Sequence, residues 1–263
     1  VNQVSITIIM WFTVKWRPKL VFSLSKVREL FSFGWKLLAS SLLNVLYMDL
    51  RTLIIGRIYN SSTLGYYNRG QQFPKVIVSN IDGSIQSVML PTLSAHQDNR
   101  KRVKEMMRRA IVSSSFLVFP MMIGMAVVAE PLVKIVLTDK WLPSVPFLQI
   151  FCVSYALMPI HTANLQAINA MGRSDIFLKL EAVKKIMGVT ILGISLPFGV
   201  YAIALGQVVS GIISSFVNAY PNKKLLDYSY KEQWLDIMPS LLISLVMGGI
   251  VYLFNFLSIR AWQ

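Results

Sequence analysis

The sequence has few of the residues with which soluble enzymes build reactive sites. It contains a single cysteine, Cys152, and two histidines, His96 and His161, which are far apart and lack the spacing of metal ligands. It also lacks a phosphate-binding loop of the G-x-x-x-x-G-K-[ST] type, a nucleophile elbow and a conspicuous pair of carboxylates. These absences exclude a disulfide framework, a thiolate metal site and ATP hydrolysis by this chain. We therefore expect a protein that is not an enzyme and that uses no cofactor or metal.

Charged residues are scarce as well. Only 14% of the 263 residues are charged, against roughly 25% in ordinary soluble domains, while 54% are hydrophobic. The hydrophobic residues form long blocks that are separated by short polar, often basic, loops. A helix of about 20 mostly apolar residues is long enough to cross ~30 Å of hydrocarbon. The sequence therefore predicts an all-α fold, that of a polytopic helical membrane protein.

The apolar blocks predict a bundle of transmembrane helices over residues 35–258. Their approximate ranges are 35–57, 73–95, 110–129, 146–170, 176–198, 200–220 and 237–258. Residues 1–14 form a shorter block. Because the sequence begins at Val1, within an apolar run, we interpret this block as the end of a truncated transmembrane helix. A cleaved signal peptide is not indicated, since a basic start and a small-residue cleavage site are missing.

Residues 15–34 predict an amphipathic helix before the first complete block. Apolar residues recur there at helical spacing, at Leu20, Leu24, Val27 and Phe31. Basic residues lie elsewhere around the helix, which is typical of a helix in the cytoplasmic interface of a membrane. The alternative is that these residues are the first turns of the next spanning helix.

The net charge of +14 is distributed unevenly along the chain. If residues 15–36, 96–109, 171–185 and 221–236 are cytoplasmic, they hold 19 of the 26 Lys and Arg residues. The others are Arg51, Arg57, Arg69, Lys75, Lys134, Lys140 and Arg260. This bias follows the positive-inside rule and sets the predicted topology. The most basic run, residues 99–109, has no aromatic residues for base stacking, so we expect anionic phospholipid rather than nucleic acid as its partner.

One face of the first complete block is polar. Plotted at about 100° per residue, five side chains share an arc of about 80°: Lys36, Ser40, Asn44, Tyr47 and Arg51. Burying a charge near the bilayer centre costs several kcal/mol, so such residues normally face a bundle interior or a wet cavity. We therefore predict a substrate cavity with Lys36, Asn44 and Arg51 as candidate contacts. The alternative for Arg51 is that it snorkels to the outer interface.

Two aspartates within the blocks, Asp49 and Asp82, are predicted to pack between helices. Asp49 lies off the polar face, some 140° from Asn44, and must find a partner elsewhere. Asp82 and Gln86 form one polar face of the next block. Its other polar face contains Asn80, Ser84, Ser87 and Pro91. Because a helix that is polar on two sides cannot face lipid broadly, we expect this helix to lie inside the bundle.

The block at 146–170 contains further polar residues: Tyr155, His161, Asn164, Gln166 and Asn169. Pro159 predicts a kink within it. Several polar spans around a shared interior indicate a water-accessible path and favour a transporter. For Ser84 or Asn164 taken singly, the pattern favours a role in holding helices together over a role in such a path.

Four stretches carry a resemblance to a known family. They are residues 33–74, with Gly56-Arg57 and Leu64-Gly65-Tyr66-Tyr67; residues 88–103, "VMLPTLSAHQDNRKRV"; residues 119–150, with a kinked helix and Trp141; and residues 169–175, "NAMGRSD". In this order they resemble the second half of the Wzx-type oligosaccharide flippases of the multidrug/oligosaccharidyl-lipid/polysaccharide (MOP) superfamily. Thr138-Asp139 departs from the pattern, because relatives often have a glycine before the Trp.

This resemblance implies a fold and a task. The chain would be the second lobe of a two-lobed MATE/MOP-like bundle, and its missing N-terminal lobe would be a partner. The complete protein would move an undecaprenyl-pyrophosphate-linked oligosaccharide to the outer leaflet of the bacterial cytoplasmic (inner) membrane by alternating access. This step serves the biosynthesis of O-antigen, capsule or exopolysaccharide.

On the same reading, three lysines at the start of the 176–198 block are candidates to receive the pyrophosphate from the cytoplasmic side. They are Lys179, Lys184 and Lys185. The alternative is that they only set the topology.

Two other classes of protein share some of these features. A MATE-like multidrug or cation antiporter would have the same fold, but its cavity should favour acidic residues, whereas the predicted stripe here is basic. A membrane polysaccharide polymerase usually carries a large outer loop. The longest predicted outer segments here, residues 58–72 and 130–145, are short, which argues against a polymerase.

Overall fold

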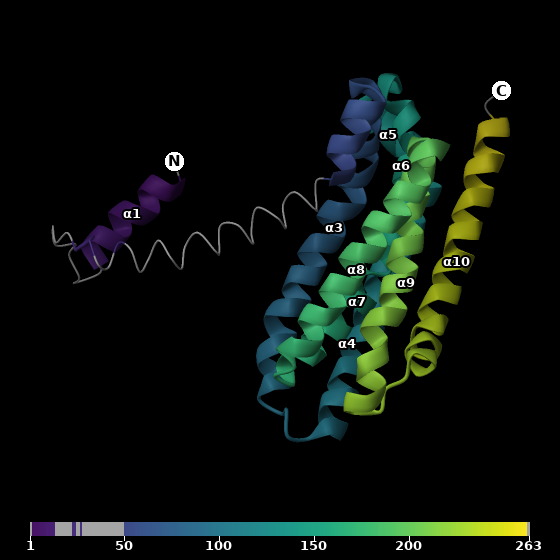
Figure 1. The fold of residues 1–263 in the computed structure, drawn as a ribbon. Helices are drawn as coiled ribbons and strands as arrows, with labels where there is room; N and C mark the ends of the chain where they lie inside the picture. The colour runs from purple at the N-terminus through teal and green to yellow at the C-terminus, as the bar shows by residue number, and fades with distance from the viewer. Residues whose placement is uncertain (1, 14–22, 25–26, 28–49, 262–263) are drawn as a thin grey trace. The chain divides into compact units, whose positions relative to one another are not determined.

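The computed structural model describes residues 2–13, 23–24, 27 and 50–261 (Figure 1). The chain divides into two units, Val1–Asp49 and Leu50–Gln263. In the first unit, α1 (Asn2–Thr13) is an apolar helix within the predicted block 1–14. Most of the predicted interfacial helix and of the predicted span 35–57 lies outside the described residues.

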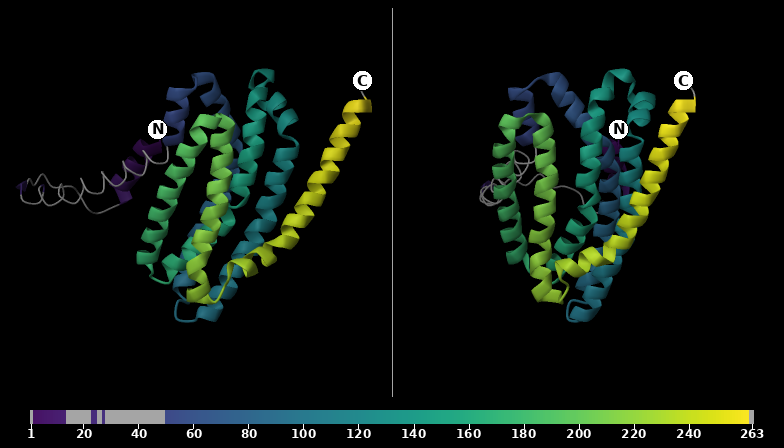
Figure 2. Two further views of the ribbon diagram at one scale, coloured as in Figure 1. Left: turned by 45° about the vertical axis from the view of Figure 1, so that its right-hand side comes forward. Right: turned by 90° about the vertical axis from the view of Figure 1, so that its right-hand side faces the viewer.

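The second unit is built from helices, and the described residues contain no strand. Residues 50–58 are helical. They are followed by α3 (Ser61–Ser94), α4 (Arg100–Val127), α5 (Ala129–Leu137), η1 (Asp139–Ser144), α6 (Val145–Ala156), α7 (Met158–Ala170), α8 (Ser174–Ser195), η2 (Leu196–Phe198), α9 (Val200–Leu226) and α10 (Tyr230–Ala261). The long helices lie side by side (Figures 1 and 2). The prediction of an all-α polytopic membrane protein is confirmed.

Within the described part of the chain, four stretches are long and apolar enough to cross a membrane. They are Arg100–Val127, Asp139–Ala170, Val200–Leu226 and Tyr230–Phe254. The helices α3 and α8 cover the predicted spans 73–95 and 176–198, but they contain more polar and charged residues. The assignment of seven spans therefore stays a prediction.

The predicted span 146–170 consists of two helices. The α6 helix ends at Ala156 and α7 begins at Met158, with Leu157 between them. Pro159 has no backbone N–H to donate to the carbonyl four residues earlier, and its ring crowds that carbonyl. The next two N–H groups, those of Ile160 and His161, both donate to the Leu157 carbonyl, at 3.2 and 3.4 Å. The break therefore falls where the proline predicts a kink.

The helices pack through buried apolar clusters. One cluster joins α3, α4 and α7 near their shared end, with Leu93, Met107 and Ile160 buried. Nearer the other end, Tyr67 packs edge-on against Phe151, with the ring centroids 5.0 Å apart. The α3 and α6 backbones approach closely at Gly70, where a Cβ atom would lie 2.5 Å from the Phe147 Cβ. Only glycine fits this crossing without a shift of the helices.

Candidate functional site

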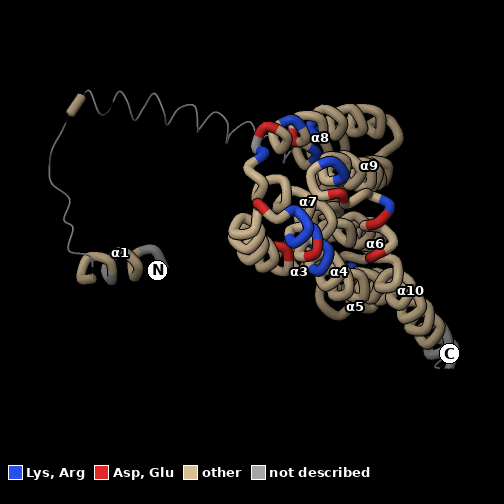
Figure 3. Tube along the Cα trace, turned by 90° about the horizontal axis from the view of Figure 1, so that it is seen from below, with Lys and Arg blue, Asp and Glu red and all other residues tan. Residues whose placement is uncertain are grey.

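Basic side chains collect at one end of the unit 50–263, which we call the basic end. Its connections join α3 to α4, α7 to α8 and α9 to α10. Seen from this end, Lys and Arg lie over α4, α8 and α9 (Figure 3). Three of the four segments that the sequence predicts to be cytoplasmic therefore meet at the same end, as the positive-inside rule requires.

One face of α4 is joined to α10 by ion pairs. The Lys104 Nζ lies 3.0 Å from a Glu232 carboxylate oxygen. Arg108 donates to Asp236, whose second carboxylate oxygen accepts the Tyr228 hydroxyl at 2.7 Å. Burial and this bond raise the pKa of Tyr228 above its usual range, so the hydroxyl stays protonated and remains a donor. These contacts fasten the start of α10 to α4.

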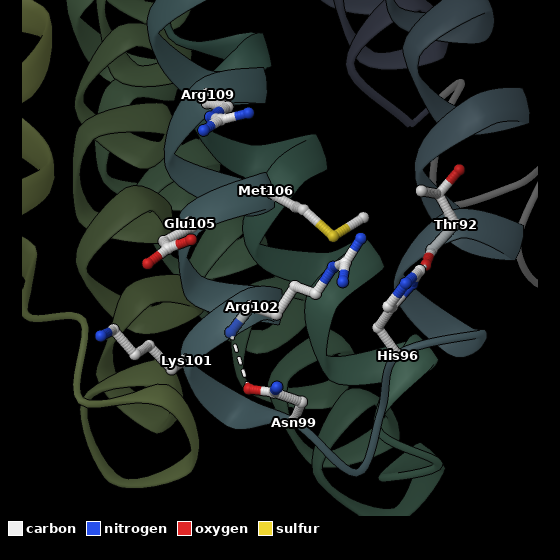
Figure 4. A pocket seen from close by; sticks show the side chains of 8 residues that line it. All are labelled: Thr92, His96, Asn99, Lys101, Arg102, Glu105, Met106 and Arg109. Carbon is white, nitrogen blue, oxygen red and sulfur yellow. Dashed lines mark hydrogen bonds between the residues drawn. The ribbon is translucent and has the colours of Figure 1, made fainter.

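Another face of α4 lines a pocket that it shares with α3. The pocket has a volume of about 550 Å³ and is lined by Thr92, His96, Asn99, Lys101, Arg102, Glu105, Met106 and Arg109. In Figure 4, Arg102 and Met106 extend from α4 toward His96, whereas Lys101 and Glu105 point away from α3. Among the described residues, neither Arg102 nor Arg109 forms an ion pair. This pocket therefore combines open volume with uncompensated positive charge.

Three buried amides join α7, α9 and α10 inside the bundle. Asn164 donates to the Gln233 Oε1 at 2.8 Å and accepts from the Gln233 Nε2 at 3.1 Å. Asn222 donates to the same Asn164 oxygen at 2.7 Å. All three residues are fully buried. Because a buried polar group that loses its partner is costly, this arrangement holds the three helices in one register.

Asp82 lies on the buried side of α3. Gln86 donates to the Asp82 Oδ2 at 3.1 Å, and Gln166 on α7 donates to the Gln86 Oε1 at 3.3 Å. The Asp82 Oδ1 is buried and has no hydrogen-bond partner among the described residues. The arrangement resembles the interhelical packing that the sequence predicts for Asp82, whose role stays a prediction.

The other polar face of α3 is exposed in the described part of the chain, and the expectation that α3 lies inside the bundle of the complete protein stays a prediction. Asn80, Ser84 and Ser87 are exposed in the structure. Each satisfies its donor on its own helix: Asn80 on the Val76 carbonyl at 2.8 Å, Ser84 on the Asn80 carbonyl at 2.9 Å, and Ser87 on the Ser84 carbonyl at 2.8 Å. Because these short side chains bond locally, they require no neighbouring helix. We call Asn80, Ser84 and Ser87 the polar face of α3.

The predicted cavity stripe is only partly visible. Lys36, Asn44 and Asp49 lie outside the described residues. Arg51 is half-buried within the helical residues 50–58. It lies near Tyr67, with which it interacts electrostatically. The assignment of these residues to a substrate cavity stays a prediction.

Of the three predicted pyrophosphate lysines, Lys179 lies in the second turn of α8, and Lys184 and Lys185 lie at its middle. Lys179 is exposed, whereas Lys184 and Lys185 are half-buried. Lys184 pairs with Glu181, three residues earlier on the same helix. Its charge is therefore partly compensated, and the proposed role of the three lysines stays a prediction.

Sequence reasoning treated the basic run at the start of α4 as one unit and missed its division into two faces. The signal was present in the spacing. Lys104 and Arg108 are four residues apart, and so are their partners Glu232 and Asp236, which matches one helix face to another. Asn222 and Gln233 were also missed, because their pairing depends on which helices are neighbours.

The helical fold, its apolar spans and its basic end together define a polytopic helical membrane protein. Residues 1–146 match the family described as Polysaccharide biosynthesis protein, and the chain belongs to this family.

Curated relatives agree with this assignment. The chain is 28% identical over 245 residues to the lipopolysaccharide biosynthesis protein WzxC of Escherichia coli (strain K12), covering 89% of this chain and 49% of WzxC. It is 27% identical over 257 residues to the teichuronic acid biosynthesis protein TuaB of Bacillus subtilis (strain 168), covering 95% of this chain and 52% of TuaB. The chain thus spans about half the length of these relatives. The resemblance to Wzx-type flippases is confirmed.

The fold also resembles that of a solved structure, the lipid II flippase MurJ in an inward closed conformation. The TM-score is 0.65, with 15% sequence identity over 98% of this chain and 60% of the MurJ chain. At this level of identity, the likeness shows the fold alone.

Proposed function

We propose that the complete protein containing this chain is a flippase, which moves a lipid-linked oligosaccharide across a membrane for polysaccharide biosynthesis. The membership of the family and the names of its relatives support this proposal. The observation that carries it is the polar face of α3. Asn80, Ser84 and Ser87 form an exposed row of amide and hydroxyl groups on a long helix of a membrane protein. Lipid would favour apolar side chains there, whereas sugar hydroxyls and water match polar ones.

The proposed cycle uses both features of the bundle. The basic end attracts the pyrophosphate of an undecaprenyl-linked unit, since Lys and Arg bind phosphate through charge-assisted hydrogen bonds. The glycan then passes along the polar face of α3 while the protein alternates between two open states, and Lys36, Asn44 and Arg51 remain the substrate contacts predicted from the sequence. The missing N-terminal lobe supplies the opposite wall, and anionic phospholipid surrounds the basic end. The site of action is the bacterial cytoplasmic membrane.

The leaflet that holds the accumulated lipid-linked unit tests this proposal. In cells that lack the complete protein, we expect single units to accumulate on the cytoplasmic face, and we expect the gene to restore export. Unpolymerised units on the outer face would instead indicate a polymerase. If no unit accumulates on either face, the flippase proposal fails.

A cation antiporter is the second candidate, and Asp82 favours it. Asp82 is a buried carboxyl group on a long helix of a membrane protein, and buried ionisable residues of this kind often mark ion pathways. An antiporter predicts that Asp82→Asn abolishes drug resistance conferred by the protein. A simple packing role predicts unchanged resistance at an equal protein level.

A further inference from the structure

We infer that the pocket between α3 and α4 binds the phosphate groups of a lipid-linked substrate at the basic end, through Arg102 and Arg109. This inference rests on the proposed function and deepens it, because it names the place where the charged part of the substrate is held. None of the residues predicted from the sequence as substrate contacts lines this pocket.

Four of the six basic residues at the start of α4 form two sets: Lys104 and Arg108 face α10, and Arg102 and Arg109 line the pocket shared with α3. At about 100° per residue, Arg102 and Arg109 lie within ~20° of each other, and Lys104 lies about 160° away. Lys104 and Arg108 are held by the carboxylates of α10. Arg102 and Arg109 have no acidic partner among the described residues. The first set secures the helix, and the second set keeps its charge available to a ligand.

The geometry of the pocket suits a phosphate group. Arg102 reaches from α4 across the gap toward His96, which lies in the turn after α3, so the guanidinium group faces the open volume (Figure 4). The planar guanidinium group can donate two parallel hydrogen bonds to a phosphate, which an ammonium group cannot do. Glu105 also lines the pocket but points away from α3, so it does not neutralise Arg102 (Figure 4).

The start of α4 adds little to binding by itself. The Asn99 side chain caps the helix by accepting the Arg102 backbone N–H at 3.1 Å. This cap occupies one of the free donors of the first turn. The anion must therefore be bound mainly by the arginine side chains, which makes those side chains the correct target for mutation.

The surroundings favour a phosphate that is attached to a lipid over a soluble one. The face of α4 that carries Arg102 and Arg109 continues to Phe116 and Leu117, which are 61% and 50% exposed. Seven residues separate Arg109 from Phe116, a rise of about 10 Å along the helix. A phosphate in the pocket would thus allow its hydrocarbon chain to lie on an apolar surface within the bilayer. The volume of about 550 Å³ falls within the usual range of small-molecule sites, about 300–1,000 Å³.

The test uses the complete protein in phosphatidylcholine nanodiscs, with undecaprenyl pyrophosphate and phosphatidylglycerol as probes. In Arg102→Ala/Arg109→Ala, we expect undecaprenyl pyrophosphate to bind at least about tenfold more weakly and phosphatidylglycerol to bind as before. The conservative variant Arg102→Lys/Arg109→Lys should lie between this variant and the wild type. If the double alanine variant does not fold, the single variants Arg102→Ala and Arg109→Ala provide the same comparison.

A matched control removes two cations from the neighbouring pocket among α4, α9 and α10. Arg100→Ala/Lys224→Ala has the same loss of charge at the same end of the bundle, and both residues line that other pocket. We expect it to bind both probes as the wild type does. If the control and the test variant lose the same affinity, binding depends on total charge and the pocket is not the site.

Three other results would overturn the inference. If the double alanine variant binds undecaprenyl pyrophosphate as the wild type does, the pocket does not bind this lipid. If the variant loses the same affinity for undecaprenyl pyrophosphate and for phosphatidylglycerol, the pocket is a general site for anionic lipid. If inorganic pyrophosphate displaces the lipid when both are at the same concentration, the hydrocarbon chain does not contribute to binding.

A transport assay tests the binding site and the proposed flippase function separately. The measurement is the leaflet-specific quenching of a fluorescent undecaprenyl-pyrophosphate sugar in proteoliposomes. If the wild type binds the probe through Arg102 but does not move it, the flippase proposal fails and the site stands. If the wild type and the double alanine variant transport equally well, the site fails and the flippase proposal stands.

Discussion

The two sides of α4 at the basic end differ in one respect. On the side of α10, Lys104 and Arg108 each contact a carboxylate. On the side of α3, Arg102 and Arg109 face a pocket in which no carboxylate pairs with them, within the part of the chain that the structure describes. The residue types and their positions along α4 are nearly the same. Whether a basic residue of α4 is paired or left open thus depends on the helix that it faces.

Among the substitutions considered, we expect Arg51→Ala to have the largest effect, a loss of polysaccharide export. This arginine has no ion pair among the described residues and so resembles the open side of α4. We predict that Arg51→Ala in the complete protein cripples polysaccharide export, because the proposed substrate cavity would lose a positive charge, while membrane insertion stays intact. Polymer output and protein level in the membrane fraction are the measurements. Normal polymer output from this variant would remove Arg51 from the site.

Next in size is the loss of the buried amide network. Asn164→Ala leaves polar groups of Asn222 and Gln233 without their partner inside the bundle. We expect the free energy of unfolding to fall by about 2 kcal/mol, more than the ~0.6 kcal/mol of an average interhelical hydrogen bond in a membrane protein. Thermal unfolding in detergent measures the change. Asn169→Ala, on the same helix, is the control, and an equal loss in both variants would contradict a special role for the network.

The neighbouring residues Arg108 and Arg109 allow a direct test of the comparison. Arg108→Ala leaves the buried Asp236 without its cation and should lower the free energy of unfolding by about 1 kcal/mol, since Arg108 itself is half exposed. Arg109→Ala should leave stability unchanged. The two variants are compared by thermal unfolding under identical conditions. If Arg109→Ala is the less stable variant, the division of α4 into a structural and a binding side is wrong.

The smallest effect is expected for a charge pair in open solvent. Lys134 and Glu130 lie 2.9 Å apart on α5, four residues from each other, and both are exposed. Glu130 raises the pKa of Lys134 through a hydrogen bond, so this lysine stays charged at neutral pH. Because exposed ion pairs contribute little, Lys134→Gln should leave the unfolding temperature unchanged. A clear decrease would mean that ion pairs of this protein act differently from surface pairs elsewhere.

Periodicity made the helices predictable. Apolar blocks and basic loops identified an all-α membrane protein and the end at which its basic loops gather, because these signals are local to each block. The break near Pro159 was predictable for the same reason. A proline acts on its own helix whatever the neighbouring helices are.

The positions of side chains relative to neighbouring helices were less predictable. The polar face of α3 was expected inside the bundle, yet Asn80 and Ser84 are exposed and bond to their own helix. The sequence pattern shows that a face is polar, but it does not show what lies opposite. For the same reason, the pocket at Arg102 and the pairing of Asn164 with Gln233 emerged only from the structure.

The break at Leu157 divides one membrane crossing into two mechanically separate rods. The α7 rod is joined to α9 and α10 by Asn164, whereas the α6 rod packs through Phe147 and Phe151 against the other end of the bundle. Pro159 has no N–H with which to tie its turn to α6, so bending at this joint sacrifices little hydrogen bonding. The chain thus has a joint within one crossing, at which the angle between α6 and α7 can change while α3, α4 and α9 run past it as unbroken helices.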